Sequence, residues 1–139
     1  VLGTLHPTSA VKTGDRIIDA LPALERGQAK TFLAQSLVGV VTQVLVRTPD
    51  GRARRAVFEL MTRNKAISKL ITSDQTHLIP SQLQTGKSAG MQLMDQALLD
   101  AINARDIDPD DAYRFAEDKK KFVRFVTDTS ILPKLDVVD

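Results

Sequence analysis

Val44-Leu-Val-Arg-Thr48 and Arg55-Ala-Val-Phe-Glu-Leu60 flank the turn sequence Pro49-Asp50-Gly51-Arg52. Both runs are rich in the β-branched and aromatic residues that strands favour. Proline presets one φ angle of a turn, and Asp-Gly supplies the positive φ that a tight reversal requires. This stretch therefore predicts a β-hairpin.

The segment before the hairpin is expected to contain a strand and two helices. Val1 to Leu5 is apolar and is interpreted as a buried strand, which the turn at residues 7–9 leaves. A short helix is expected over residues 15–19, ending near Pro22. From Glu25 onward apolar residues recur at helical spacing, so one face of a second helix should be buried. These residues are Ala29, Phe32, Leu33, Leu37 and Val40.

The segment after the hairpin is expected to be helical. One short helix is predicted over residues 65–71, one ends near Gly86, and a longer one begins around Gly90. The longer helix carries Met91, Met94, Leu98 and Ile102 on one face. Asp108-Pro109 begins another helix, because aspartate caps a helix and proline suits its first position. Phe115, Phe122 and Val126 should form its apolar stripe, and residues 127–139 a docked or frayed tail.

Composition narrows the class of protein. The chain has 139 residues, of which 42% are hydrophobic and 26% charged, so it is expected to fold as an ordinary domain. Its net charge of +2 is little evidence for a nucleic-acid partner. The absence of cysteine excludes disulfides and thiolate metal sites. The longest apolar stretch, Leu37 to Val46, is too short to span a bilayer, so a cytoplasmic location is expected.

The octapeptide Ser81-Gln-Leu-Gln-Thr-Gly-Lys-Ser88 ends like a phosphate-binding loop. A P-loop requires glycine at the position of Ser81, and a strand before it that aims the backbone amides at phosphate. A proline-initiated helical segment precedes this one instead. We therefore predict that Gly86 ends a helix and that Lys87-Ser88 lies in the following turn.

The candidate site residues include the two histidines and an acidic cluster. His6 lies at the carboxyl end of the expected first strand, where α/β sheets place functional groups, although a structural role is the alternative. His77 is interpreted as a surface or capping residue, and no third ligand indicates a zinc site. Asp108, Asp110 and Asp111 lack the glycine and distal glutamate of a calcium loop, so helix capping explains them.

Several segments occur together in a specific order. They are Leu5-His6-Pro-Thr-Ser-Ala10, Asp15-Arg-Ile-Ile-Asp19, Gln35-Ser36-Leu37 to Gln43, Ala66-Ile67 with Leu70-Ile71, Gln84-Thr85-Gly86, and Gly90-Met91-Gln92 with Asp95-Gln96. The order resembles the histidine box and subsequent motifs of the PilT-type secretion ATPases, the motors of type IV pilus retraction and twitching motility. The resemblance covers about residues 1–116.

This resemblance implies an α/β, predominantly helical fold. It would be the C-terminal portion of a RecA-like P-loop ATPase domain, with few strands besides the hairpin, followed by a helical region. Residues 1–63 are then the trailing part of the ATPase core, and residues 64–139 are the helical C-terminal region. In the family the Walker A loop, Asp box and Walker B segment precede the histidine box. ATP and Mg²⁺ are therefore expected in the full-length protein, whereas this part alone should bind no cofactor and lack ATPase activity.

The resemblance also implies roles for individual residues. His6 matches the box histidine, which looks towards the nucleotide pocket, and Arg16 matches the arginine of the following helix. The family's retraction signature, Ala-Ile-Arg-Asn-Leu-Ile-Arg-Glu, aligns with Ala66-Ile-Ser-Lys-Leu-Ile-Thr-Ser73. The apolar positions Ala66, Ile67, Leu70 and Ile71 are retained, and they are expected to pack a helix against the core and to relay motion. Catalytic residues and metal ligands are not expected in this part.

Partners follow from the same resemblance. It implies a homo-oligomeric ring of six subunits at the pilus machinery, on the cytoplasmic side of the inner membrane, without nucleic acid. An unpaired edge on the Val1–Leu5 strand would favour self-association. A retraction motor proper and a divergent paralogue both stay open. The alternative from another class is a non-enzymatic helical interaction module that binds nucleic acid or anions through Lys119 to Arg124.

Overall fold

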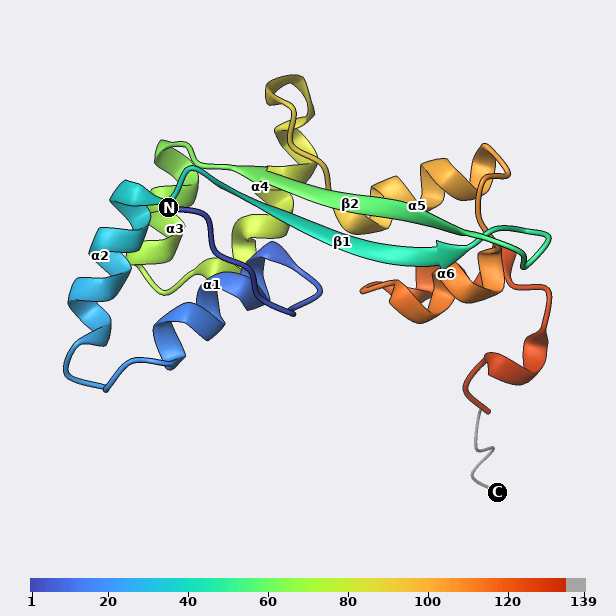
Figure 1. The fold of residues 1–139 in the computed structure, drawn as a ribbon, viewed down its shortest axis with the longest axis horizontal. Helices are drawn as coiled ribbons and strands as arrows, with labels where there is room; N and C mark the ends of the chain where they lie inside the picture. The colour runs from blue at the N-terminus through green and yellow to red at the C-terminus, as the bar shows by residue number, and fades with distance from the viewer. Residues whose placement is uncertain (135–139) are drawn as a thin grey trace.

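A long β-hairpin forms the spine of the molecule in the computed structural model, which describes residues 1–134 (Figure 1). Strands β1 (Gly39–Arg47) and β2 (Arg54–Thr62) pair antiparallel, with Gly39 opposite Thr62 and Arg47 opposite Arg54. In the turn, Gly51 adopts a φ of +69°. The predicted hairpin is confirmed, but β1 begins at Gly39, five residues earlier than expected.

Six α-helices accompany the hairpin in residues 1–134. They are α1 (Ala10–Asp19), α2 (Arg26–Ser36), α3 (Lys65–Thr72), α4 (Ile79–Thr85), α5 (Met94–Asn103) and α6 (Pro109–Phe115). Short 3₁₀ turns lie at Thr76–Leu78, Lys87–Ala89, Lys119–Lys121, Val123–Phe125 and Thr129–Ile131. The helices expected near residues 15–19, 65–71 and before Gly86 are present, although α1 begins five residues earlier than expected. The predominantly helical α/β class is confirmed.

Side-chain caps fix where three helices begin. Ser9 Oγ accepts a hydrogen bond from the Lys12 N–H at 3.1 Å, and Asn64 Oδ1 accepts from the Ile67 N–H at 2.9 Å. Asp108 Oδ1 accepts from the Asp110 N–H at 3.1 Å. Each bond satisfies an amide that the first turn of a helix leaves without an intrahelical partner. The predicted cap at Asp108 is therefore confirmed.

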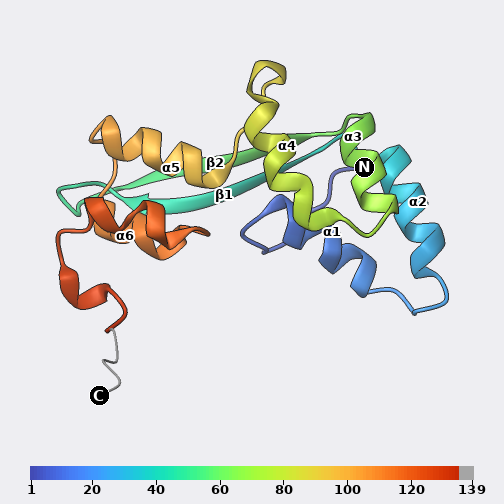
Figure 2. The ribbon, with the colours of Figure 1, turned by 180° about the vertical axis from the view of Figure 1, so that it is seen from behind.

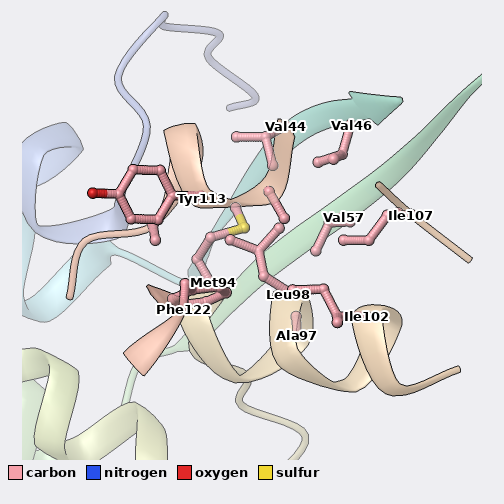
Figure 3. Close-up of a cluster of buried hydrophobic side chains, with 12 residues drawn as sticks. Val44, Val46, Val57, Met94, Ala97, Leu98, Ile102, Ile107, Tyr113 and Phe122 are labelled. Carbon is pink, nitrogen blue, oxygen red and sulfur yellow. The ribbon is translucent and has the colours of Figure 1, made fainter. Parts of the chain in front are cut away.

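The buried face of the hairpin spans two separate hydrophobic clusters. The base-end cluster lies among α1 to α4 and comprises Ala10, Ile18, Ala34, Met61, Ile67, Ile71, Ile79, Leu83 and Met91. The turn-end cluster lies among α5, α6 and the segment beyond them and comprises Val44, Val46, Val57, Met94, Ala97, Leu98, Ile102, Ile107, Ala112, Tyr113, Ala116 and Phe122 (Figure 3). Figure 2 shows the two groups of helices beside opposite ends of the hairpin. The hairpin therefore connects two cores.

The expectation of a buried strand at Val1–Leu5 is wrong. This segment has no regular secondary structure, and Val1, Leu2 and Leu5 are exposed. An apolar run becomes a strand only where a neighbouring strand pairs with its backbone, and the two strands in residues 1–134 pair with each other. The edge that was expected to drive self-association is therefore not formed by these residues.

The predicted helix from Glu25 to Val40 is too long. α2 ends at Ser36, and the chain turns into β1 at Gly39, where an added Cβ would lie 2.7 Å from the Met61 carbonyl oxygen. The buried side of α2 centres on Ala34, whereas Phe32 is 72% exposed. Two residues correspond to a rotation of about 200° around a helix, so Phe32 points away from the core.

Two boundaries after the hairpin also differ from the prediction. α5 begins at Met94 instead of Gly90, although Met91, Met94, Leu98 and Ile102 are all buried as expected. α6 ends at Phe115, so one helix does not carry the predicted stripe through Val126. Phe122 is nevertheless completely buried, because the chain folds back through 3₁₀ turns.

The tail is docked at its beginning. The Asp110 carboxylate accepts hydrogen bonds from the Thr127 N–H at 2.7 Å and from the Thr127 hydroxyl. These bonds hold the segment after Phe125 against the first turn of α6. The prediction of a docked tail is therefore confirmed at Thr127 and Asp128. The last five residues of the predicted tail, 135–139, lie outside the described part of the chain.

Candidate functional site

His6 lies in the irregular segment that leads into α1, four residues before Ala10. The histidine is exposed, and no hydrogen bond or ion pair joins its side chain to any described residue. Its expected position at a strand end is wrong, because that strand is not formed. As the sequence predicts, the chain leads from His6 through a turn into a helix, although this helix begins already at Ala10.

Arg16 is an exposed residue of α1. It lies six residues after Ala10, or about 9 Å along the helix axis at 1.5 Å per residue. No hydrogen bond joins it to His6 in the described part of the chain, so the structure does not bring the two side chains into contact. The neighbouring Asp15 accepts a 3.1 Å hydrogen bond from the Thr76 hydroxyl, which ties α1 to the turn after α3.

Glu59 is a buried carboxylate that the sequence analysis missed. It is 4% exposed; its Oε1 accepts from the Ala10 N–H at 2.8 Å and its Oε2 from the Met94 N–H at 3.0 Å. Ala10 and Met94 are the first residues of α1 and α5. Negative charge is favourable at helix N-termini, and here one side chain serves two of them. The signal was an acidic residue on the apolar side of a strand, in period-two register with Val57 and Met61.

Asp95 is a second buried carboxylate, next to Met94. It is 6% exposed, and its two oxygens accept from the Glu117 and Asp118 N–H groups, both at 2.9 Å. Glu117 in turn forms an exposed 2.9 Å ion pair with Lys12 of α1. The entry of α1, the start of α5 and the segment after α6 are therefore linked by polar contacts.

The retained signature residues lie on α3, where Ile67 and Ile71 are buried and Leu70 is half-buried. The expectation that Ala66 also packs in the core is wrong, since it is exposed. Successive helical residues are rotated by about 100°, which carries position 66 beyond the edge of the stripe that Ile67 and Ile71 form. α3 is anchored on α2 by a 2.7 Å hydrogen bond from Ser68 Oγ to the Ala34 carbonyl oxygen.

A groove runs between α2 and α3. Its lining includes Ser68 and Thr72, which stand where the retraction signature has arginines. Three cationic residues line the same groove: Arg63, Lys65 and Lys69. Positive charge is therefore present beside α3 although both signature arginines are replaced.

Comparison with known proteins identifies relatives of this fold. The chain is 42% identical over 120 residues to a twitching motility protein of Neisseria gonorrhoeae, covering 86% of this chain and 32% of that protein. It is 43% identical over 98 residues to the type IV pilus retraction ATPase PilT of Pseudomonas aeruginosa, covering 70% of this chain and 28% of that protein. No family model matches the chain.

A solved structure of the pilus retraction motor PilT with bound ADP has the same fold. It superposes with a TM-score of 0.74 at 30% identity, over 86% of this chain and 33% of that one. The chain matches the C-terminal part of a PilT-type secretion ATPase. It spans about a third of the length of these relatives.

The loop that resembles a phosphate-binding loop is a helix end in this PilT-type chain. Gly86 follows the last residue of α4, and its N–H donates to the Gln82 carbonyl oxygen at 2.9 Å. Lys87 begins an exposed 3₁₀ turn. The prediction that Gly86 ends a helix is confirmed.

The basic segment of the PilT-type chain is partly engaged within the molecule. Lys119 Nζ donates to the carbonyl oxygens of Tyr113 and Ala116 at 3.0 and 3.3 Å, which caps the end of α6. Lys121 Nζ lies 3.9 Å from an Asp118 carboxylate oxygen. The relatives favour the motor interpretation over the helical interaction module at Lys119 to Arg124.

The remaining polar residues of the PilT-type chain do not form a metal site within residues 1–134. No group of three or more histidine, aspartate or glutamate side chains there is arranged to hold a metal ion. His77 is exposed in the turn Thr76–Leu78, as the sequence predicts for a surface residue. No helix in the same residues has both the length and the apolar character needed to cross a membrane.

Proposed function

We propose that this chain is the C-terminal part of a motor ATPase that powers type IV pilus retraction and twitching motility. The observation that carries the proposal is the 42–43% identity to a twitching motility protein and to a pilus retraction ATPase. The agreement in fold with a pilus retraction motor supports it. The chain would contribute to converting ATP hydrolysis into movement of subunits.

The nucleotide site would be completed by residues outside this chain. The described residues lack a strand-loop-helix phosphate cradle, and they present no carboxylate cluster for Mg²⁺. We therefore assign ATP and Mg²⁺ to the full-length protein. His6 and Arg16 would lie beside the nucleotide pocket. His6 is in the exposed segment before α1, and Arg16 is on the exposed surface of that helix.

The proposal includes an assembly and a location. The subunits would form a homo-hexameric ring at the pilus machinery, on the cytoplasmic side of the inner membrane. Residues 1–63 would complete the ATPase core, and residues 64–139 would form the helical region that the core moves. The buried stripe of α3 and its bond to α2 support a role for this helix in relaying movement.

ATP turnover by the full-length protein that contains this sequence tests the proposal. A His6→Ala variant should hydrolyse ATP at least about tenfold more slowly, because a positioned polar group typically contributes about 10²-fold or more to catalysis. His77→Ala is the matched control, because His77 is also exposed and the resemblance gives it no place at the nucleotide pocket. Equal turnover of wild type and His6→Ala would refute the assignment of His6 to the pocket.

A further inference from the structure

The buried face of the hairpin is apolar on both sides of a single polar pair. Thr42 and Glu59 lie directly opposite each other in the strand register, and both are 4% exposed. Met61, on one side of this pair, belongs to the base-end cluster, whereas Val44 and Val57, on the other side, belong to the turn-end cluster. The Thr42–Glu59 pair therefore marks the boundary between the two cores.

Glu59 bonds to one helix from each core. Oε1 accepts a hydrogen bond from the N–H of Ala10, a residue of the base-end cluster. Oε2 accepts one from the N–H of Met94, a residue of the turn-end cluster. The two hydrogen bonds measure 2.8 and 3.0 Å. Because both amides are buried first-turn donors, loss of the carboxylate leaves both without a partner. Glu59 thus fixes the entry of α1, and with it the segment bearing His6, relative to the start of α5.

Thr42 carries a buried hydroxyl without a hydrogen-bond partner among residues 1–134. Buried hydroxyls are nearly always satisfied, so an orphan one in a core calls for an explanation. Directly opposed residues of antiparallel strands have Cβ atoms about 4.5–5.5 Å apart, so side-chain rotation can bring the Glu59 carboxylate to the Thr42 hydroxyl. Glu59 can therefore exchange the Ala10 N–H for the Thr42 O–H without leaving the core.

We propose that Glu59 is a positioning residue for the His6 segment, and that Thr42 is its alternative donor when the entry of α1 moves. The inference rests on the proposed function, because the movement would accompany nucleotide turnover. In the arrangement seen here, Glu59 bonds to both helices and Thr42 is unpartnered. In the second arrangement, Thr42 donates to Glu59 Oε1, and the Ala10 N–H at the entry of α1 is released while α5 stays bonded through Oε2.

Hydrogen exchange of the full-length protein tests whether Glu59 positions the entry of α1. In Glu59→Gln the side-chain amide can accept from only one of the two N–H groups, so exchange should accelerate about tenfold or more in peptides containing Ala10 or Met94. Asp95→Asn is the matched control, because Asp95 is a buried carboxylate that binds two N–H groups elsewhere. It should accelerate exchange at residues 117 and 118 and leave Ala10 unchanged. Unchanged exchange at both Ala10 and Met94 in Glu59→Gln, or equal acceleration throughout the chain, would overturn the proposal.

Thr42→Val tests the second part, and it does so without removing Glu59. The substitution keeps the side-chain shape and deletes the orphan hydroxyl, so the melting temperature should rise while kcat for ATP falls about tenfold and KM changes less than about twofold. Thr42→Ser keeps a hydroxyl and should retain at least about half of the wild-type kcat. A higher melting temperature with unchanged kcat would show a purely structural hydroxyl and overturn the role of Thr42 as alternative donor.

A double-mutant cycle separates this inference from the proposed function. If Glu59 acts through the His6 segment, Glu59→Gln should lower kcat about tenfold in wild type and less than about twofold in a His6→Ala background. Equal effects in both backgrounds would contradict action through His6. If His6→Ala leaves turnover unchanged, the proposed role of His6 fails, whereas the exchange experiment still decides whether Glu59 positions α1.

Discussion

The Ser68 hydroxyl donates a 2.7 Å hydrogen bond to the carbonyl oxygen of Ala34. Ala34 is buried in the last turn of α2, where carbonyl groups have no intrahelical donor. The bond therefore satisfies an otherwise unpartnered acceptor and joins α2 to α3 at one point. Ser68 stands where the retraction signature has an arginine, so the contact is formed at a position where this chain departs from that signature.

Removal of this hydroxyl should weaken the packing of α3. We expect Ser68→Ala to lower the free energy of unfolding by about 1 kcal/mol, the usual net worth of one hydrogen bond. Urea denaturation measures the change. Ser73→Ala is the control, because the Ser73 hydroxyl is exposed and bonds only locally, to the Lys69 carbonyl and the Gln75 side chain. A loss in Ser73→Ala as large as in Ser68→Ala would contradict a specific role of the contact between α2 and α3.

The apolar stripe of α3 should contribute more stability than the hydrogen bond. Ile67 is completely buried in the base-end cluster, so Ile67→Ala should destabilise the chain by about 2–5 kcal/mol through lost burial and the cavity it leaves. Ala66→Ser, on the neighbouring exposed position, should change stability by less than about 0.5 kcal/mol. Thermal unfolding of both variants checks the comparison. A large loss of stability in Ala66→Ser would show that Ala66 packs in the core after all.

Local signals in the sequence predicted most of the elements correctly. The Pro-Asp-Gly turn and the cap at Asp108 act within a few residues, and both are present in the structure. The predicted strand at Val1–Leu5 was wrong, because a strand depends on a distant partner, which no local pattern reveals. The predicted burial of Phe32 was wrong, because helical spacing shows which residues share a stripe but not which side of the helix the fold covers.

The site was predicted less completely than the fold. The resemblance supplied His6 and Arg16, but their environment depends on contacts across the chain. Glu59 contacts Ala10, which is 49 positions away in the sequence, and Met94, which is 35 positions away. Its acidic side chain on the apolar side of β2 was the available clue. The two amides that it binds become apparent only when α1 and α5 are placed beside the hairpin.

Lys87 should have no role in binding nucleotide. It lies in an exposed turn after α4, without the preceding strand of a phosphate-binding loop. Lys87→Ala should therefore change ATP turnover of the full-length protein by less than about twofold, although a P-loop lysine reaches the phosphates directly. A severe loss of turnover would show that this residue contacts phosphate after all.

Gly86, in contrast, should be required for stability. An added Cβ would lie 2.9 Å from the Gln82 carbonyl oxygen and 2.8 Å from Met91 Sδ. We expect Gly86→Ala to cost about 1–3 kcal/mol in the free energy of unfolding, since the backbone oxygen cannot move away easily. Urea denaturation of Gly86→Ala beside Gly14→Ala tests this, because nothing lies within 4 Å of the corresponding atom at Gly14. Equal stability of the two variants would contradict the crowding at Gly86.

Docking of the tail should depend on pH through Asp110. Hydrogen bonds from Thr127, the side-chain bond foremost, hold the pKa of the Asp110 carboxyl below its ordinary value of 3.8. A carboxyl whose pKa is lower in the folded state stabilises the fold above the unfolded pKa, and this contribution is lost as the pH falls through the folded pKa. The segment at Thr127 should therefore stay docked above pH 4 and be released under more acidic conditions.

Nuclear magnetic resonance can follow this release at the Thr127 amide. Its chemical shift should titrate with a midpoint below pH 3.8, and Asp110→Asn should abolish that transition. Asp50 provides an internal control, because bonds from Thr48 and the Arg52 N–H lower its pKa independently at the hairpin turn. The Arg52 amide should therefore titrate unchanged in Asp110→Asn. A Thr127 midpoint at or above pH 3.8 would contradict this prediction. The pKa of Asp110 would then not be lowered in the folded state, so its ionised carboxylate would not favour the docked tail.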